Sequence, residues 1–305
     1  MTRSRVRSAA LLGAAALASP SAWAHGGDAF GASGAEPWIA VALAVSGALY
    51  VRGWVAATRS EGSRRRGARR GALFAAGWLT LAVALVSPLA AATGGVFSAH
   101  MIQHELLMVI AAPLMVLGRP LAIWTWALPQ HWRRAAARPL RGAAVQRAWA
   151  TLSAPLAATV VHGAAIWLWH IPRVFERSEA SIAAHALQHS VFLFSALLFW
   201  WALLKPGRAS GIGSAVLCLF VTMLQTGALG VLLTFSGDVW YPHATAHAGQ
   251  WGLTPLEDQQ LGGLVMWVAA SVPYVVGALA LAAQWFRDRN PGGPHDEVAL
   301  RPASR

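Results

Sequence analysis

Apolar runs of about twenty residues recur along this chain and constrain its fold more than any other feature. A helix of roughly twenty apolar residues crosses the hydrocarbon layer of a membrane. With 56% hydrophobic and only 12% charged residues among 305, the chain is too apolar for a soluble domain of this length. The sequence predicts an all-α integral membrane protein, a bundle of seven transmembrane helices within residues 37–286. The predicted spans are 37–57, 71–91, 100–119, 149–171, 182–204, 214–236 and 258–286.

Blocks of arginine lie between these runs and predict the orientation of the bundle. The 58–70 and 129–148 connections carry most of them, and Lys205 and Arg208 lie in a third, shorter connection. Connections rich in Lys and Arg stay in the cytoplasm, so we predict the N-terminus outside and the C-terminus inside. The formal net charge of +12 then reflects topology, and we predict no binding to nucleic acid.

Both ends of the chain are predicted to lie outside the bundle. Arg3, Arg5 and Arg7 precede the apolar segment Ala9–Ala18, and Ala22-Trp23-Ala24 has the small-x-small pattern of a cleavage site. These features predict a signal peptide over residues 1–24, with an uncleaved signal anchor as the alternative. A short outer segment over 25–36 would follow it. Residues 287–305 contain Pro-Gly-Gly-Pro and no apolar periodicity, which predicts a disordered cytoplasmic tail.

Nine of the eleven histidines fall on the predicted outer side of the membrane. Two residues four apart on a helix share one face. Three histidine pairs have this spacing and would each form a stripe: His100 with His104, His185 with His189, and His243 with His247. We expect a ladder of imidazoles around one outward-facing cavity, with His100, His170 and His185 near the surface. His104 and His189 would lie one turn deeper.

The donor types predict copper, with zinc as the next choice. The single cysteine, Cys218, lies inside an apolar run, so thiolate sites and disulfides are excluded. Imidazole, thioether and carboxylate without thiolate suit copper. The candidate metal ligands are His100, His104, His162, His170, His185, His189, Met101 and Glu105. Further candidates in the outer segments are His25, His243, His247, Glu257 and Asp258.

Each candidate also has a structural interpretation. A membrane histidine is often hydrogen-bonded to a neighbouring helix, and a buried methionine often fills core space. Thr254-Pro255-Leu256-Glu257 predicts a helix start with an N-cap, a proline and a capping box, which could account for both Glu257 and Asp258. Gln103, Gln188 and Gln225 could tie helices together or orient an imidazole.

Enzymatic chemistry finds little support in the sequence. His104-Glu105 begins like a zinc-protease motif, but Met108 stands where the second histidine belongs. The chain offers metal ligands and no evident nucleophile, so we predict a binding protein. Two other functions stay open. Bis-histidine ligation of haem by His104 and His189 would make an electron carrier or a haem-modifying enzyme. A copper or proton transporter would need polar groups that continue toward the cytoplasm.

Several ordered motifs resemble one family. They are His100-Met101-Ile102-Gln103-His104, the segment Ala112–Pro120, Trp169-His170-Ile171-Pro172, His185-Ala186-Leu187-Gln188-His189 and the segment Leu256–Gly263. Together they resemble the CtaG-like, caa(3)-type cytochrome c oxidase assembly factor family of multi-helix bacterial membrane proteins.

The resemblance implies a role in maturing haem–copper oxidase in the bacterial plasma membrane, with copper supplied or inserted at the outer side. Cytochrome c oxidase subunits, membrane lipid and a periplasmic copper chaperone are then the expected partners. The motif residues carried over are His100, His104, His170, His185, His189, Glu257 and Asp258. We expect copper to be captured at the surface, with His243 or His247 assisting, and to pass inward by ligand exchange.

Overall fold

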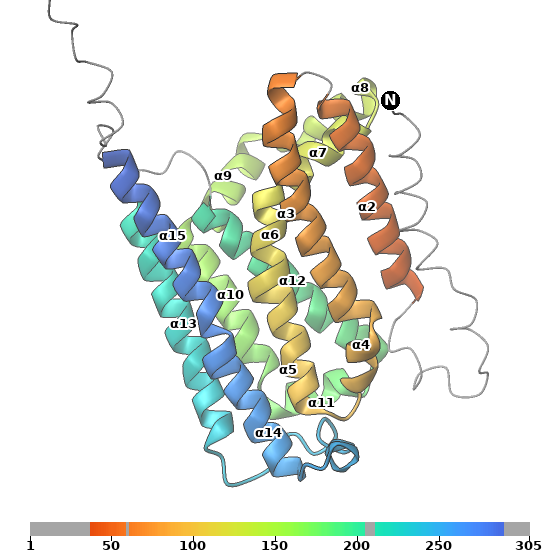
Figure 1. The fold of residues 1–305 in the computed structure, drawn as a ribbon, viewed down its shortest axis with the longest axis vertical. Helices are drawn as coiled ribbons and strands as arrows, with labels where there is room; N and C mark the ends of the chain where they lie inside the picture. Colours follow the sequence, from red (N-terminus) through yellow and green to blue (C-terminus); the bar gives the residue numbers. More distant parts are fainter. Residues whose placement is uncertain (1–36, 59–60, 205–210, 290–305) are drawn as a thin grey trace, which may run out of the picture.

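The computed structural model describes residues 37–58, 61–204 and 211–289, which form helices and turns without a strand (Figure 1). The predicted signal peptide and His25 lie outside the described residues. The first half contains α2 (Pro37–Ala57), α3 (Glu61–Val86), α4 (Pro88–Ala92), α5 (Phe97–Glu105), α6 (Ala112–Gly118), α7 (Pro120–Ala127), α8 (Gln130–Ala137) and α9 (Ala143–Leu152). The second half contains α10 (Pro155–Trp169), α11 (Pro172–Glu179), α12 (Ile182–Leu204), α13 (Ile212–Thr234), α14 (Pro255–Leu264) and α15 (Ser271–Arg289).

Among the described residues, six helices are long and apolar enough to cross a membrane, and a seventh span arises if α9 and α10 are counted together. This confirms the predicted all-helical, multi-pass class. The bounds of α2 and α12 are those of the predicted spans 37–57 and 182–204. The helix α3 begins at Glu61, so the arginines before residue 71 extend a helix instead of a loop. The helix α15 continues to Arg289, three residues past the predicted end at 286.

The predicted span 149–171 is not one straight helix. The axes of α9 and α10 differ by 69°, and the break precedes Pro155. Ala154 is extended there (φ −68°, ψ 139°), because the ring of a following proline disfavours the helical conformation. The helix α10 has only 15 residues, which is about 22 Å at the usual rise per residue.

Two spans contain a π-helical turn in mid-course. Residues Leu106–Ala111 join α5 to α6, and Val265–Ala269 join α14 to α15. A π-turn frees a backbone carbonyl that needs another partner. The indole Nε1 of Trp200 on α12 supplies it by donating to the carbonyl of Met108 at 3.0 Å. This bond ties α12 to the span that carries the first histidine pair.

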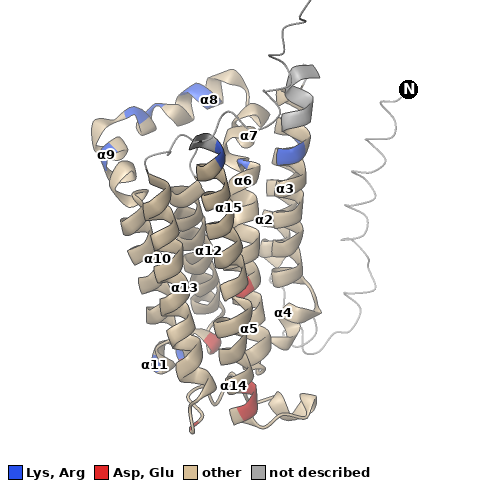
Figure 2. Cartoon of the chain, turned by 60° about the vertical axis from the view of Figure 1, so that its left-hand side comes forward, with Lys and Arg blue, Asp and Glu red and all other residues tan. Residues whose placement is uncertain are grey.

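The two ends of the bundle differ in charge (Figure 2). Arginines of α8 and α9 lie at one end, beyond the tops of the spans. The acidic residues of α11 and α14 lie at the other end, where α11 also carries Arg173 and Arg177. The histidines of α5 and α12 lie at this second end. The start of α5 packs there against α4 and α14. The fold therefore separates an arginine-rich end from a histidine-rich end.

Candidate metal centre

Two helices bring four imidazoles together. His100 and His104 lie on α5, and His185 and His189 lie on α12. Within each pair the ring centroids are 4.3 Å and 4.4 Å apart. Between the helices, the centroids of His100 and His185 and those of His104 and His189 are each 5.2 Å apart. The structure thus joins two one-turn histidine pairs into a single cluster.

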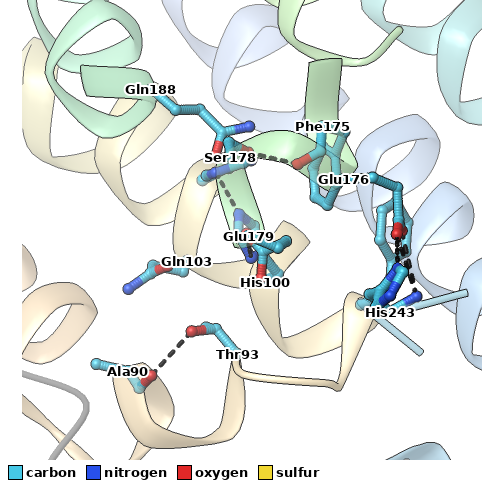
Figure 3. Close-up of polar contacts among 12 residues, drawn as sticks. Ala90, Thr93, His100, Gln103, Phe175, Glu176, Ser178, Glu179, Gln188 and His243 are labelled. Atoms are coloured by element: carbon cyan, nitrogen blue, oxygen red, sulfur yellow. Dashed lines mark hydrogen bonds and ion pairs between the residues drawn. The ribbon is translucent and has the colours of Figure 1, made fainter. Parts of the chain in front are cut away.

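Two sets of possible ligands overlap within this cluster. The histidine triad comprises His100, His104 and His189, and the Glu179 group comprises His100, Glu179 and His185. In each set the ligand atoms lie within 4.8 Å of one another. His100 belongs to both sets. Its Nε2 is 2.8 Å from Nε2 of His104, and its Nδ1 is 3.5 Å from a carboxylate oxygen of Glu179 (Figure 3).

Several nitrogens of the cluster are buried without a hydrogen-bond partner. They include Nδ1 of His104, Nε2 of His185 and Nε2 of His189. His100 and His104 are almost completely buried, at 0% and 1% exposure. Buried polar atoms are normally satisfied, because an unpaired one costs free energy. Imidazole nitrogens without a hydrogen-bond partner are available to coordinate a cation.

Glu179 is not among the ligands predicted from the sequence, and it lies in the connection that the predicted spans 149–171 and 182–204 leave without a helix. That connection instead forms α11, and Glu179 is its last residue. Ser178 holds α11 against α12 by donating to Oε1 of Gln188 at 3.1 Å. Burial and the nearby carboxylate of Glu176 raise the pKa of Glu179 to about 8. One sequence signal could have identified Glu179 as a ligand: it is an acid in a short connection between two helices that carry histidines.

His170 lies beside the cluster but belongs to neither set. Its ring centroid is 6.1 Å from that of His104. Its Nδ1–H donates to the carbonyl of Ile166 at 2.7 Å, which leaves Nε2 with an unpaired lone pair. The Tyr241 hydroxyl donates to the backbone carbonyl of His170 at 2.7 Å, and burial raises the pKa of Tyr241 above its usual range. His170 is therefore held in place as a neighbour of the histidine triad.

Three other predicted ligands lie elsewhere. His162 on α10 contacts the Ser195 hydroxyl through Nδ1 at 3.0 Å. Met101 is fully buried, and its side chain lies close to Gly262 on α14. Glu105 is in neither ligand set. The structure does not bring these three side chains into the cluster.

A cavity of about 400 Å³ lies at the mouth of the cluster. Its lining includes Glu176, Arg177, Glu179, His243 and His247. His243 and His247 sit in turns and not on a helix, so their spacing of four does not form a stripe. Figure 3 shows the His243 ring against the carboxylate of Glu176, a contact made through Nδ1. The His247 Nδ1–H donates to the carbonyl of Gly94 at 2.8 Å.

The two acids of α14 act as helix caps. Glu257 completes the predicted capping box, accepting from the Thr254 backbone N–H at 2.7 Å, while its own N–H donates to the Thr254 hydroxyl at 3.2 Å. Asp258 is buried and accepts from the backbone N–H groups of Phe97 and Ser98, at 2.7 Å and 3.0 Å. Asp258 therefore caps α5, the helix that carries His100.

Comparison with known proteins identifies relatives along most of the chain. Uncharacterised proteins of Mycobacterium bovis and Mycobacterium tuberculosis are each 29% identical over 234 residues, covering 73% of this chain and 35% of theirs. An uncharacterised protein of Mycobacterium leprae is 25% identical over 228 residues, covering 69% of this chain and 34% of its own. The chain thus spans about a third of the length of these relatives. No solved structure matches significantly.

The family match covers nearly all the described helices. The sequence profile of the cytochrome c oxidase caa3 assembly factors matches residues 48–288. The chain belongs to the cytochrome c oxidase caa3 assembly factor family.

Proposed function

We propose that this assembly factor binds copper at the histidine triad and passes it to a subunit of cytochrome c oxidase. One observation carries the proposal: His100, His104 and His189 offer ligand atoms within 4.8 Å of one another in a buried site. The three side chains come from two membrane spans that are tied by the bond between Trp200 of α12 and Met108 of the π-turn after α5. The site is therefore preorganised by the fold.

The donor set supports copper. Imidazoles without thiolate suit copper, with zinc next. Nε2 of His189 is buried without a hydrogen-bond partner, and Nε2 of His100 and Nε2 of His104 face each other at 2.8 Å. A bound cation would satisfy such nitrogens, because a neutral imidazole coordinates through a free lone pair. The unpaired Nε2 of His170 could serve as an additional ligand beside the triad.

The charge distribution supports an outward-facing site. Arg133, Arg134, Arg138, Arg141 and Arg147 all belong to α8, α9 or the turn between them, at the end opposite the histidines. Short connections rich in arginine stay in the cytoplasm. The histidine end would then face the outer side of the bacterial plasma membrane, where a copper chaperone could deliver the ion.

The packing of the cluster favours a bare ion over haem. Bis-histidine ligation by His104 and His189 needs a flat porphyrin between the two rings. The ring centroid of His100 is 4.3 Å from that of His104 and 5.7 Å from that of His189. His100 thus occupies the space beside both rings that a porphyrin would need.

Metal analysis with an absorption spectrum tests the proposal on full-length protein purified in mild detergent. We expect stoichiometric copper in the wild type and its loss in the His104→Ala/His189→Ala double variant. His162→Ala is the matched control, since His162 is as buried as His104 but lies outside both ligand sets. This control should keep its copper and support oxidase maturation, and the double variant should do neither.

Two results would replace the proposal. A haem spectrum that disappears in the double variant would indicate the haem-binding function instead. Wild-type protein with neither copper nor haem would indicate that assembly depends on protein contact alone.

A further inference from the structure

The geometry points to a second copper position, formed by Glu179, His185 and Nδ1 of His100, through which copper enters the histidine triad from the mouth cavity. This inference rests on the proposed copper-binding function and adds a loading route to it. Glu179 would be the ligand that receives the ion.

The two positions share His100 but use opposite edges of its ring. The Nε2 atom faces His104 at 2.8 Å, while Nδ1 faces Glu179 at 3.5 Å. An ion bound at Nδ1 and an ion bound at Nε2 would lie on different sides of the same imidazole. His185 and His189, one turn apart on α12, give each side a further ligand. An ion can then move inward by exchanging ligands singly, without leaving the protein.

Glu179 connects this route to the surface. Its side chain is 11% exposed and lines the cavity of about 400 Å³, whereas the His100 side chain is fully buried. Glu179 is the one residue found both in that lining and in either ligand set, among the residues that the structure describes. An ion that enters the cavity therefore meets Glu179 before it meets the triad.

A carboxylate at this point has a physical purpose. Moving a cation from water into a buried site costs free energy unless an opposite charge accompanies it. The triad offers neutral imidazoles, and Arg177 adds a positive charge to the cavity lining. When the ion takes the place of its proton, the Glu179 carboxylate supplies the compensating charge while the ion sheds its water. Glu176 is the other acid of the lining, but its carboxylate already contacts His243.

Copper-loading kinetics on the full-length protein test the inference. Cu(I) would be presented as its bicinchoninate complex, and transfer would be followed by loss of the chelate absorbance. We expect Glu179→Gln to load copper at least about tenfold more slowly than the wild type. A loss of this size in metal affinity or activity is typical when a metal site loses a supporting group. The equilibrium affinity of the triad should change much less than the loading rate.

Glu176→Gln is the matched control, because it makes the same substitution on the same helix and in the same cavity, at a residue that lies outside both ligand sets. It should load at the wild-type rate. His185→Gln removes another ligand of the same second position, from α12. It should slow copper loading as Glu179→Gln does, and it tests the route even if the Glu179→Gln variant does not fold.

The failures are distinguishable. Wild-type protein that takes no copper would overturn the proposed function and this inference together. Wild-type protein that takes copper, with Glu179→Gln and His185→Gln loading at the normal rate, would overturn the route alone. Equal slowing in Glu176→Gln and Glu179→Gln would also overturn it, because the effect would then be one of local charge and not of ligation.

Discussion

The carboxylate of Asp258 binds Ser98 twice, through the backbone N–H at 3.0 Å and the hydroxyl at 2.5 Å, although the two residues are 160 positions apart. Val96, which precedes α5, provides no side-chain cap. The first N–H groups of a helix have no partner within it. An acid from α14 therefore completes α5 and fixes the end from which His100 projects.

Removal of this cap should destabilise the protein. Asp258→Ala would leave the N–H groups of Phe97 and Ser98 buried without acceptors. We expect a loss of about 1–3 kcal/mol in the free energy of unfolding, the usual cost of such unsatisfied groups. Thermal unfolding in detergent measures it. The neighbouring Glu257→Gln variant is the control, with a smaller loss because its capping box is exposed; equal losses would contradict the buried cap.

Close contact between α13 and α14 should make Gly263 intolerant of a side chain. A Cβ atom there would lie 2.6 Å from the backbone nitrogen of Thr234 and 2.7 Å from the carbonyl oxygen of Gly230. We expect Gly263→Ala to cost about 1–3 kcal/mol through overpacking, measured as a lower unfolding temperature. Gly213→Ala on α13 is the control, since a Cβ there meets nothing within 4 Å. A Gly263→Ala variant as stable as the Gly213 control would rule out the tight contact.

The loop at the cavity mouth should depend on Gly95. This glycine has φ +108°, a conformation that L side chains rarely adopt, and a Cβ there would collide with the His247 ring. We expect Gly95→Ala to cost about 1–3 kcal/mol. Gly94→Ala has only the Ala91 carbonyl oxygen nearby, at 3.9 Å, and should be tolerated. The measurement is the unfolding temperature of Gly95→Ala compared with that of Gly94→Ala. Equal values would be inconsistent with strain at Gly95.

The bond across the π-turn should contribute measurably. Trp200→Phe keeps an aromatic ring but removes the donor to the Met108 carbonyl. We expect a loss of about 0.5–1.5 kcal/mol, as for a typical buried hydrogen bond. Trp251→Phe, on a side chain that is 66% exposed, should change the unfolding temperature little. Were the two variants to behave alike, the bond would contribute nothing to stability.

Local sequence patterns predicted local structure well. The apolar lengths 37–57 and 182–204 are the bounds of α2 and α12, and the Thr254 capping box begins α14. Family membership was also accessible, because the motif residues keep their order along the chain. The span 149–171 was wrong in its continuity: apolar composition extends through Pro155, while the proline ring imposes a break that hydropathy does not register.

The sequence by itself determined where the long apolar helices lie, where the charges gather and which histidines of α5 and α12 share a helical face, because these depend on residues a few positions apart. Only the tertiary structure decided that α5 meets α12, that Asp258 caps α5 and that Glu179 reaches His100. Lipid solvates every apolar helix about equally well, so hydropathy cannot specify which helices are neighbours. That choice depends on shape, as where Phe97 packs against Gly262, and on a few polar contacts between distant segments, as where Gln103 donates to the carbonyl of Ala84.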